Sequence, residues 1–360
     1  MKDSGNSFVS RDFRFDNAKA FLIITVVVGH LAELLLSTVA FSQDKNPVWL
    51  SVLYKCIYIF HMPAFMIVSG RFAKRRVDTN DWITVFNKII VPYLLIQTCM
   101  MLFCNTVNYQ STAKFSYLKP LFGLWYLLGI GLYQLITPQI LKVLKRKELL
   151  LPISLAVAIL LSYQEKQFYG NFQRFVSYYP YFVFGYLTAT KEFEICKKAL
   201  FKILSVFGFF GLVILVINFP TLLQVPIING KRVYSEIIKF VDFSHIEFLI
   251  FLIIKYFLGF IIFFFVLGLV SSKKNIFTPL GKDSTYVYIL HCFIIVALTA
   301  LSKHYGILSF CENQLFALLI CMSGIPLSFV LISPPIKKIT SWLFAPNFDI
   351  RLIAKHLETH

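Results

Sequence analysis

The sequence has little charge and no long polar segment. Asp, Glu, Lys and Arg make up only 15% of its 360 residues, whereas a soluble domain averages about 25%. It also lacks a Pro- or Ser-rich linker and an obvious internal repeat. These absences exclude an ordinary soluble protein of several domains. The 58% hydrophobic content and the mean hydropathy of +0.71 indicate a membrane protein instead.

The sequence also lacks a cysteine motif, and we expect no cleavable leader. Its seven cysteines are scattered, and none forms a Cys-x-x-Cys pair. Their odd number and spacing fit neither a metal site nor a disulfide framework, so we interpret them as small apolar packing residues. No small-residue cleavage site follows a short apolar segment near the N-terminus. We therefore expect the first apolar segment to be retained as a span.

Long apolar segments separated by short basic loops predict an all-α, polytopic bundle of membrane helices. A span needs about 20 mostly apolar residues. We expect a transmembrane domain over residues 1–345 and a short cytoplasmic tail over 346–360. About ten spans are predicted, at residues 18–40, 49–70, 83–105, 120–141, 149–163, 175–190, 199–219, 245–270, 283–302 and 310–333.

The basic residues are distributed unevenly between the two sets of loops. Of 35 Lys and Arg residues, 23 fall before the first span, after even-numbered spans or after the tenth, and nine fall in the opposite loops. The positive-inside rule therefore predicts that both termini are cytoplasmic. The net charge of +17 is spread over short loops without a nucleic-acid recognition motif. We expect it to meet anionic lipid or a polyanionic cytosolic cofactor rather than nucleic acid.

The first predicted span contains ionisable residues that a simple anchor does not need. Lys19 and His30 are eleven residues apart, so they lie nearly above one another on a helix, and Asp16 and Glu33 fall within about 60° of the same line. Such a stripe must face protein or a wet cavity rather than lipid. Alternatively, Lys19 and Asp16 reach the membrane interface while His30 bonds a neighbouring helix.

The second span brings another histidine to a similar depth. It runs in the opposite direction, and its His61 lies next to Pro63, which kinks helices and frees a carbonyl. Histidine suits proton transfer because its pKa lies near neutrality. The span ends in a basic cluster that either binds phosphates or serves as a topological signal. This cluster, with a further lysine before Pro92, comprises Arg71, Lys74, Arg75, Arg76 and Lys88.

The ninth span places three more polar residues on one helical face. Ser284, Tyr288 and His291 are spaced four and three residues apart, and all lie in the half that is predicted to be cytoplasmic. A structural hydrogen-bonding role and a catalytic role both stay open for them.

Five stretches together resemble the acyltransferase 3 family of integral-membrane acyltransferases, especially its fucose 4-O-acetylase-like branch. They occur in the expected order over nearly the whole chain. They are FDNAKAFLIITVVVGH (Phe15 to His30), IYIFHMPAFMIVSGRFAK (Ile57 to Lys74), LWYLL (Leu124 to Leu128), YFVFGYL (Tyr181 to Leu187) and STYVYILH (Ser284 to His291).

The resemblance implies about ten membrane helices in a bacterial inner or plasma membrane, and transfer of an acyl group to a sugar hydroxyl. The expected donor is acetyl-CoA or another acyl-CoA, used as a co-substrate, with no permanently bound cofactor or metal. The expected acceptor is a glycan or a lipid-linked sugar, with glycan-biosynthesis proteins as candidate partners. A proton-coupled secondary transporter or flippase is the competing class, because intramembrane His and Glu also serve proton coupling.

The family pattern also suggests site residues. A basic residue, ten intervening residues and a histidine mark its first helix and match Lys19 and His30, while its second-span histidine matches His61. The family's usual Ser-Gly-Tyr reads Ser-Gly-Arg here, so Arg71 is a departure. The stretch LWYLL adds Trp125 as a pocket candidate.

Acyl transfer from a thioester to an alcohol needs a base for the hydroxyl and stabilisation of an oxyanion. We expect His30 to be the base, Glu33 or Asp16 to orient it, and His61 to be a second proton carrier or oxyanion donor. Direct transfer and an acetyl-His30 intermediate both stay open. The residues expected at the CoA phosphates are Lys19, Arg71, Arg75, Arg76 and Lys88.

Overall fold

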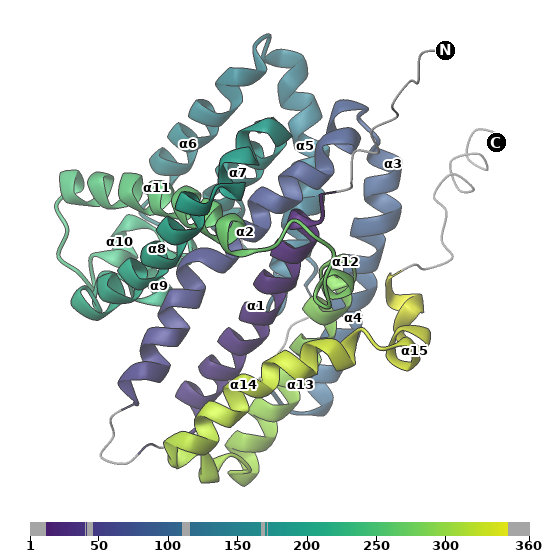
Figure 1. The fold of residues 1–360 in the computed structure, drawn as a ribbon, viewed down its shortest axis with the longest axis vertical. Coiled ribbons are helices and arrows are strands. Elements are labelled where there is room, and N and C mark those ends of the chain that lie inside the picture. The colour runs from purple at the N-terminus through teal and green to yellow at the C-terminus, as the bar shows by residue number, and fades with distance from the viewer. Residues whose placement is uncertain are drawn as a thin grey trace.

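The computed structural model describes residues 12–39, 41, 46–109, 116–166, 170 and 172–344. Within these ranges the chain is helical and contains no strand, as the sequence predicts (Figure 1). The predicted C-terminal tail, residues 346–360, lies outside the described residues.

Seven of the described helices are long and apolar enough to cross a membrane. One of them is a composite in which the short α3 (Trp82–Val85), the π-helical turn η2 (Phe86–Ile90) and α4 (Val91–Thr106) follow one another without a break. The other six are α1 (Arg14–Thr38), α2 (Val48–Asp78), α8 (Ala199–Asn218), α11 (His245–Leu269), α13 (Ser284–Tyr305) and α14 (Gln314–Leu331).

Three of the ten predicted spans contain helices that do not meet these criteria. α6 (Leu150–Leu161) and α7 (Phe172–Leu187) have 12 and 16 residues, and at about 1.5 Å per residue both are shorter than a hydrocarbon layer of about 30 Å. α5 (Trp125–Val143) is longer but carries Gln134, Pro138 and Gln139 in its interior. The structure therefore supports seven candidate spans, whereas the sequence predicted about ten.

Shorter helices connect the long ones and form the C-terminal end of the described chain. Of these, α12 matters for the site because it packs directly on α1. The set comprises η3 (Lys147–Leu149), η4 (Thr190–Lys197), α9 (Val225–Ile228), α10 (Tyr234–Ile237), α12 (Thr278–Lys282), η5 (Ser309–Glu312) and α15 (Pro334–Phe344).

α1 and α2 lie side by side at the centre of the bundle. α1 also packs against α12, α13 and α14, whereas α2 packs against α5, α7 and α11 (Figure 1). The outer helices α8, α11 and α14 expose large apolar side chains such as Phe207, Ile254 and Leu319. Lipid solvates such surfaces, whereas α1 and α2, which carry His30, Glu33 and His61, are enclosed by the other helices.

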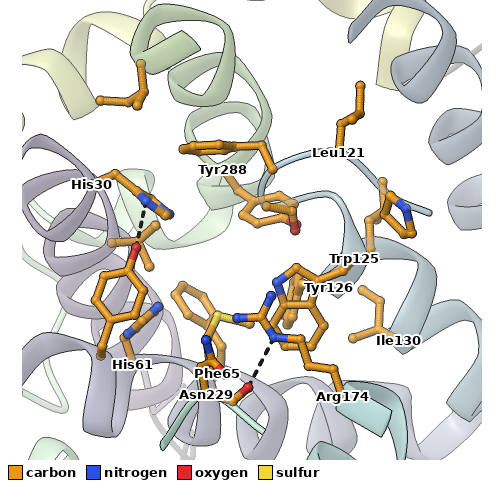
Figure 2. Close-up of a pocket in the computed structure, with 18 of the residues that line it drawn as sticks. His30, His61, Phe65, Leu121, Trp125, Tyr126, Ile130, Arg174, Asn229 and Tyr288 are labelled. Carbon is orange, nitrogen blue, oxygen red and sulfur yellow. Dashed lines mark hydrogen bonds between the residues drawn. The ribbon is translucent and has the colours of Figure 1, made fainter. Parts of the chain in front are cut away.

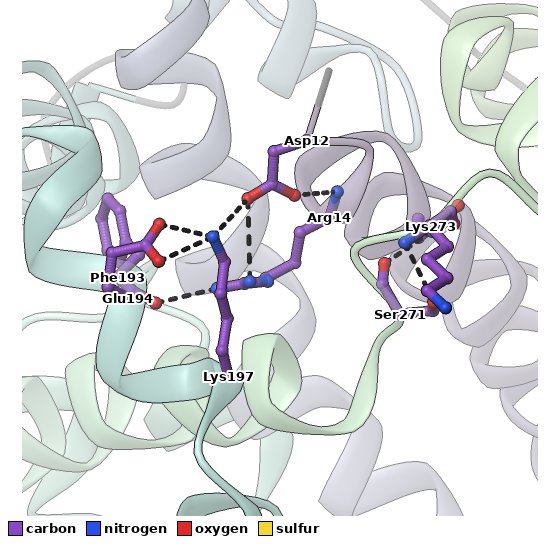
Figure 3. A network of polar contacts seen from close by, with 8 residues as sticks. Asp12, Arg14, Phe193, Glu194, Lys197, Ser271 and Lys273 are labelled. Carbon is purple, nitrogen blue, oxygen red and sulfur yellow. Dashed lines mark hydrogen bonds and ion pairs between the residues drawn. The ribbon is translucent and has the colours of Figure 1, made fainter. Parts of the chain in front are cut away.

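Segments predicted to be cytoplasmic meet at one end of the bundle. There, Arg14 at the start of α1 donates a 2.8 Å hydrogen bond to the carbonyl of Phe193 in η4. Lys197 of η4 lies 3.7 Å from Asp12 (Figure 3). Asn17 donates to the carbonyls of Ser271 and Lys273 after α11. These contacts bring the start of α1, the helix η4 and the loop after α11 to the same end of the bundle. Spans of alternating direction require this of loops that lie on one side of the membrane.

Two glycines let α2 and α7 approach until their backbones touch. A Cβ atom on Gly70 of α2 would overlap the carbonyl oxygen of Phe182, and one on Gly185 of α7 would overlap that of Ile67. Small residues permit such close packing of membrane helices, where apolar burial gives little driving force between helices. This contact fixes α7 against α2, and both helices carry side chains of the site described below.

Gly185→Ala is expected to destabilise the protein because its methyl group meets backbone, which cannot rotate away. Overpacking costs about 1–3 kcal/mol, and sometimes more. Thermal unfolding of the detergent-solubilised protein, followed by size-exclusion chromatography, measures the loss. Gly211→Ala is the matched control, since a Cβ on Gly211 of α8 meets no described atom within 4 Å beyond its chain neighbours and the adjacent backbone of its own helix. Equal melting temperatures for the two variants would contradict the close-packing interpretation.

Candidate active site

A cavity of about 910 Å³ lies between α1, α2, α5, α7 and α13 (Figure 2). It falls at the upper end of the range for small-molecule sites, about 300–1,000 Å³. Its lining contains His30, Glu33, His61, Trp125 and Tyr288, which the sequence analysis singled out. Residues that are far apart in the sequence thus share one cavity.

The cavity reaches both ends of the bundle. Lys19 and Ser37 of α1 both line it, and a separation of 18 residues corresponds to about 27 Å along a helix. Lys282, the last residue of α12, and Lys303, in the last turn of α13, line it as well. We define the first mouth as Lys19, Phe72, Arg76 and Lys282, and the second mouth as Ser37, Lys119, Lys231 and Lys303.

His30 is held by a carboxylate and a tyrosine between the two mouths. Its Nδ1 lies 3.1 Å from Oε2 of Glu33, one turn further along α1, and 2.9 Å from the hydroxyl of Tyr58 on α2. Tyr58 also donates a 2.5 Å hydrogen bond to the same Glu33 oxygen, and the hydroxyl of Tyr54 lies 3.4 Å from Oε1. Two helices therefore fix the orientation of this imidazole.

These partners determine which His30 nitrogen is available for chemistry. An ionised carboxylate only accepts hydrogen bonds, so Nδ1 carries the proton that faces Glu33. Nε2 then keeps its lone pair, as in a general base oriented by a carboxylate. The His30–Glu33 pair thus has the arrangement needed to take a proton from a hydroxyl.

Two more histidines lie beside this pair. The His61 ring is 4.8 Å from the Tyr58 ring, and the His291 ring is 5.4 Å from the His30 ring, measured between centroids. Nδ1 of His61 lies 2.7 Å from the carbonyl of Ile57, and Nδ1 of His291 lies 2.8 Å from that of Val287. Because carbonyls only accept, each Nδ1 is protonated and each Nε2 is an acceptor.

On the opposite wall, Arg174 of α7 is positioned by an aromatic ring and a backbone carbonyl. Its guanidinium carbon lies 4.0 Å from the centroid of Trp125, and its Nε donates a 3.3 Å hydrogen bond to the carbonyl of Asn229. Figure 2 shows the guanidinium directed into the cavity, on the opposite side from His30. Tyr126 and Tyr288 complete this wall, with ring centroids 5.1 Å apart.

Comparison with known proteins shows the family of the chain. A family model described as "Acyltransferase domain", that of the acyltransferase 3 family, matches residues 12–333, most of the chain. The chain belongs to this family. The matched domain is an acyltransferase domain, and several of the described helices are candidate membrane spans. Family membership favours an acyltransferase over the transporter class that the sequence left open.

Two relatives named nodulation protein NolL also match the chain. The protein from Sinorhizobium fredii is 28% identical over 199 residues, which is 50% of this chain and 49% of the relative. The protein from Mesorhizobium japonicum is 46% identical over 61 residues, 17% of this chain and 15% of the relative. The chain thus spans about half or less of the length of these curated relatives. No solved structure matches it.

The fold brings only part of the predicted basic set into the cavity. Lys19 and Arg76 line the first mouth, and Arg76 also donates a 2.6 Å hydrogen bond to Gln134. Arg71 lies outside the lining, packed 4.4 Å from the Phe15 ring, while Arg75 and Lys88 are exposed elsewhere. Residues 71 and 76 differ by about 140° around a helix, so they face different surroundings.

Two other predicted pocket residues also lie outside the lining. Asp16 is buried and pairs with Lys19 at 3.2 Å, and α12 covers its side of α1 through a close backbone contact at Gly281. His291 is buried behind His30. Ser284, by contrast, lines the cavity near the first mouth.

The sequence analysis missed Tyr58, Arg174 and Lys282. Tyr58 precedes His61 by three residues, so helical spacing already placed it on the same face as that histidine. Lys282 follows Gly281 just before the ninth predicted span and offered no signal beyond its charge. Arg174 directly precedes the sixth predicted span. A charged residue at the end of an apolar segment was the signal in the sequence for a polar role.

Tyr58→Phe is expected to slow acyl transfer about 10- to 100-fold. The variant removes a hydroxyl that contacts both His30 and Glu33, and a hydrogen bond to a charged group contributes about 1.5–3 kcal/mol. Initial rates in membranes with equal amounts of each variant measure the effect. Tyr54→Phe is the control, since its hydroxyl reaches only Glu33, at 3.4 Å. Similar losses in both variants would remove the special role assigned to Tyr58.

Proposed function

We propose that this acyltransferase belongs to the fucose 4-O-acetylase-like branch and is an O-acyltransferase. It moves an acyl group, most simply acetyl, from acyl-CoA to a sugar hydroxyl in a cell-surface or lipid-linked glycan. One observation carries the proposal: a single cavity reaches both ends of the bundle and holds an oriented histidine–carboxylate pair between them. Two substrates that approach from opposite sides of a membrane need such a path.

His30 is the general base of the proposed reaction. The sugar hydroxyl oxygen attacks the thioester carbonyl carbon, and Nε2 of His30 takes the hydroxyl proton. The tetrahedral intermediate then breaks its carbon–sulfur bond, and the CoA thiolate leaves and takes the proton back from the imidazolium. Glu33 holds the ring and stabilises the transient positive charge, in line with its 3.1 Å contact to Nδ1.

His61 is assigned to proton transfer rather than to oxyanion binding. Its Nδ1 proton is directed to the carbonyl of Ile57, which leaves Nε2 as an acceptor while the ring is neutral. Tyr58 contacts both His30 and His61, and this arrangement suits His61 as a second proton carrier. A transient acetyl-His30 remains the alternative to direct transfer, because the same Nε2 is also a nucleophile.

The first mouth is proposed to bind the CoA phosphates from the cytoplasm. Lys19, Arg76 and Lys282 supply three cations there, and cations bind phosphate by charge-assisted hydrogen bonds. The positive-inside distribution of loops favours the cytoplasm for this end. The bilayer in question is proposed to be the bacterial inner or plasma membrane, with the glycan acceptor and glycan-biosynthesis proteins as partners.

His30→Ala is expected to lower transfer of radiolabelled acetyl from acetyl-CoA to the glycan fraction by about 10²–10⁴-fold, the usual contribution of a general base. Membranes with wild type, His30→Ala or empty vector are compared. His304→Ala is the control, because this exposed histidine at the end of α13 is not part of the cavity lining. Full activity in His30→Ala would refute the assignment, and absent label in every glycan fraction of the wild type would refute the proposed function.

The paired variant Arg76→Gln/Lys282→Gln is expected to raise the KM for acetyl-CoA about three- to tenfold at low salt, with a smaller effect on kcat. Each exposed ion pair is worth about 0.2–1 kcal/mol, and salt screens it. The matched control is Arg75→Gln/Lys274→Gln, which removes the same charge from exposed residues outside the lining. If the control pair raised the KM as much, bulk charge rather than the first mouth would bind CoA.

A further inference from the structure

The cavity has cations at both mouths, although one anionic donor needs only one of them. The second mouth carries Lys119, Lys231 and Lys303, and Arg174 lines the cavity nearby. Loops on that side of the predicted topology hold only nine of the 35 Lys and Arg residues. Four of these nine therefore gather around this cavity. The positive-inside rule depletes these loops of cations and does not explain the concentration.

Among the described residues, the lining of the cavity gives Arg174 no acidic side chain as an ion-pair partner. Glu33 is the one carboxylate among the described residues that line it, and it already accepts from Tyr58 and faces His30. Among the described residues, no carboxylate forms an ion pair with Arg174. Arg174 is partly exposed in the cavity, and a bound anion would form charge-assisted hydrogen bonds with its guanidinium.

Arg174 is held in a geometry that suits binding of an oxyanion. Its Nε is used by the carbonyl of Asn229, and its planar guanidinium lies over Trp125, so the terminal N–H groups are left to face the cavity (Figure 2). A fixed guanidinium matches the two oxygens of a carboxylate or phosphate. Trp125 in turn packs against Tyr178, with centroids 5.1 Å apart, so the whole stack is braced by α7.

We propose that the acyl acceptor is anionic: its phosphate or carboxylate group binds Arg174, with Lys231 contributing long-range attraction at the second mouth. This inference rests on the proposed function, since it assigns the second mouth to the acceptor. The acceptor hydroxyl then lies in the cavity between Arg174 and His30. A neutral sugar lacks the group that compensates the guanidinium and binds more weakly.

The test uses the full chain in phosphatidylcholine nanodiscs, saturated with desulfo-CoA so that the donor site is occupied. Calorimetry measures the dissociation constants of methyl glucoside, methyl glucuronide and glucose 1-phosphate. In the wild type, the two anionic probes are expected to bind at least tenfold more tightly than methyl glucoside. Arg174→Gln is expected to abolish that difference, and Arg174→Lys to retain part of it because the charge remains.

Arg232→Gln is the matched control. This arginine lies three residues after Asn229, the hydrogen-bond partner of Arg174, but it stacks on Phe240 at 4.2 Å and is not part of the lining. Its loss should therefore leave the selectivity for anions unchanged. Equal affinity of the wild type for charged and neutral probes would overturn the proposal. So would equal effects of Arg174→Gln and Arg232→Gln.

Nanodiscs that contain phosphatidylglycerol distinguish an acceptor group from a lipid head group. If this lipid suppressed binding of the anionic sugars to the wild type, the cations would serve lipid and the proposal would be wrong. Transfer of label from acetyl-CoA, measured on the same preparation without desulfo-CoA, tests the proposed function separately. Transfer without anion selectivity would overturn only the present inference, whereas selectivity without transfer would overturn the proposed function and leave the anion site.

Discussion

The cost of placing ionisable groups in hydrocarbon determines how this protein is arranged. His30 and Glu33 lie deep in α1, and such residues are tolerated only where protein or water surrounds them. The central position of α1 and α2 meets this requirement, because α12, α13 and α14 cover one helix and α5, α7 and α11 the other. The outer helices then carry the apolar surface that contacts lipid. The position of the reactive pair and the order of the helices are thus two results of one constraint.

Much of the first two helices could be predicted because their signals are local. The spacing between His30 and Glu33 fixes a shared face, and the opposite directions of two consecutive spans fix the similar depth of His61. The span count was less predictable. α6 and α7 are apolar but short, and α5 is interrupted by glutamine and proline, so hydropathy windows overstate how clearly they cross the membrane.

The basic residues mark the limit of prediction from sequence. Arg71, Arg75 and Arg76 look alike in the chain, yet a helix directs their side chains into different surroundings, and only Arg76 reaches the cavity. Arg174 is recognisable only once the fold brings α7 beside α5 and the loop at Asn229. Local spacing predicts which residues share a face, whereas the opposite wall of a cavity depends on contacts distant in sequence.

A cavity that reaches both ends of a membrane protein is also a route along which ions could leak. Seven lysine and arginine side chains line it, against a single carboxylate among the described residues. A positive potential of this kind repels protons and metal cations, in the way that cationic constrictions do in water-conducting pores. The same charges that attract anionic substrates therefore give the enzyme a means of keeping the membrane potential intact while its two substrates meet.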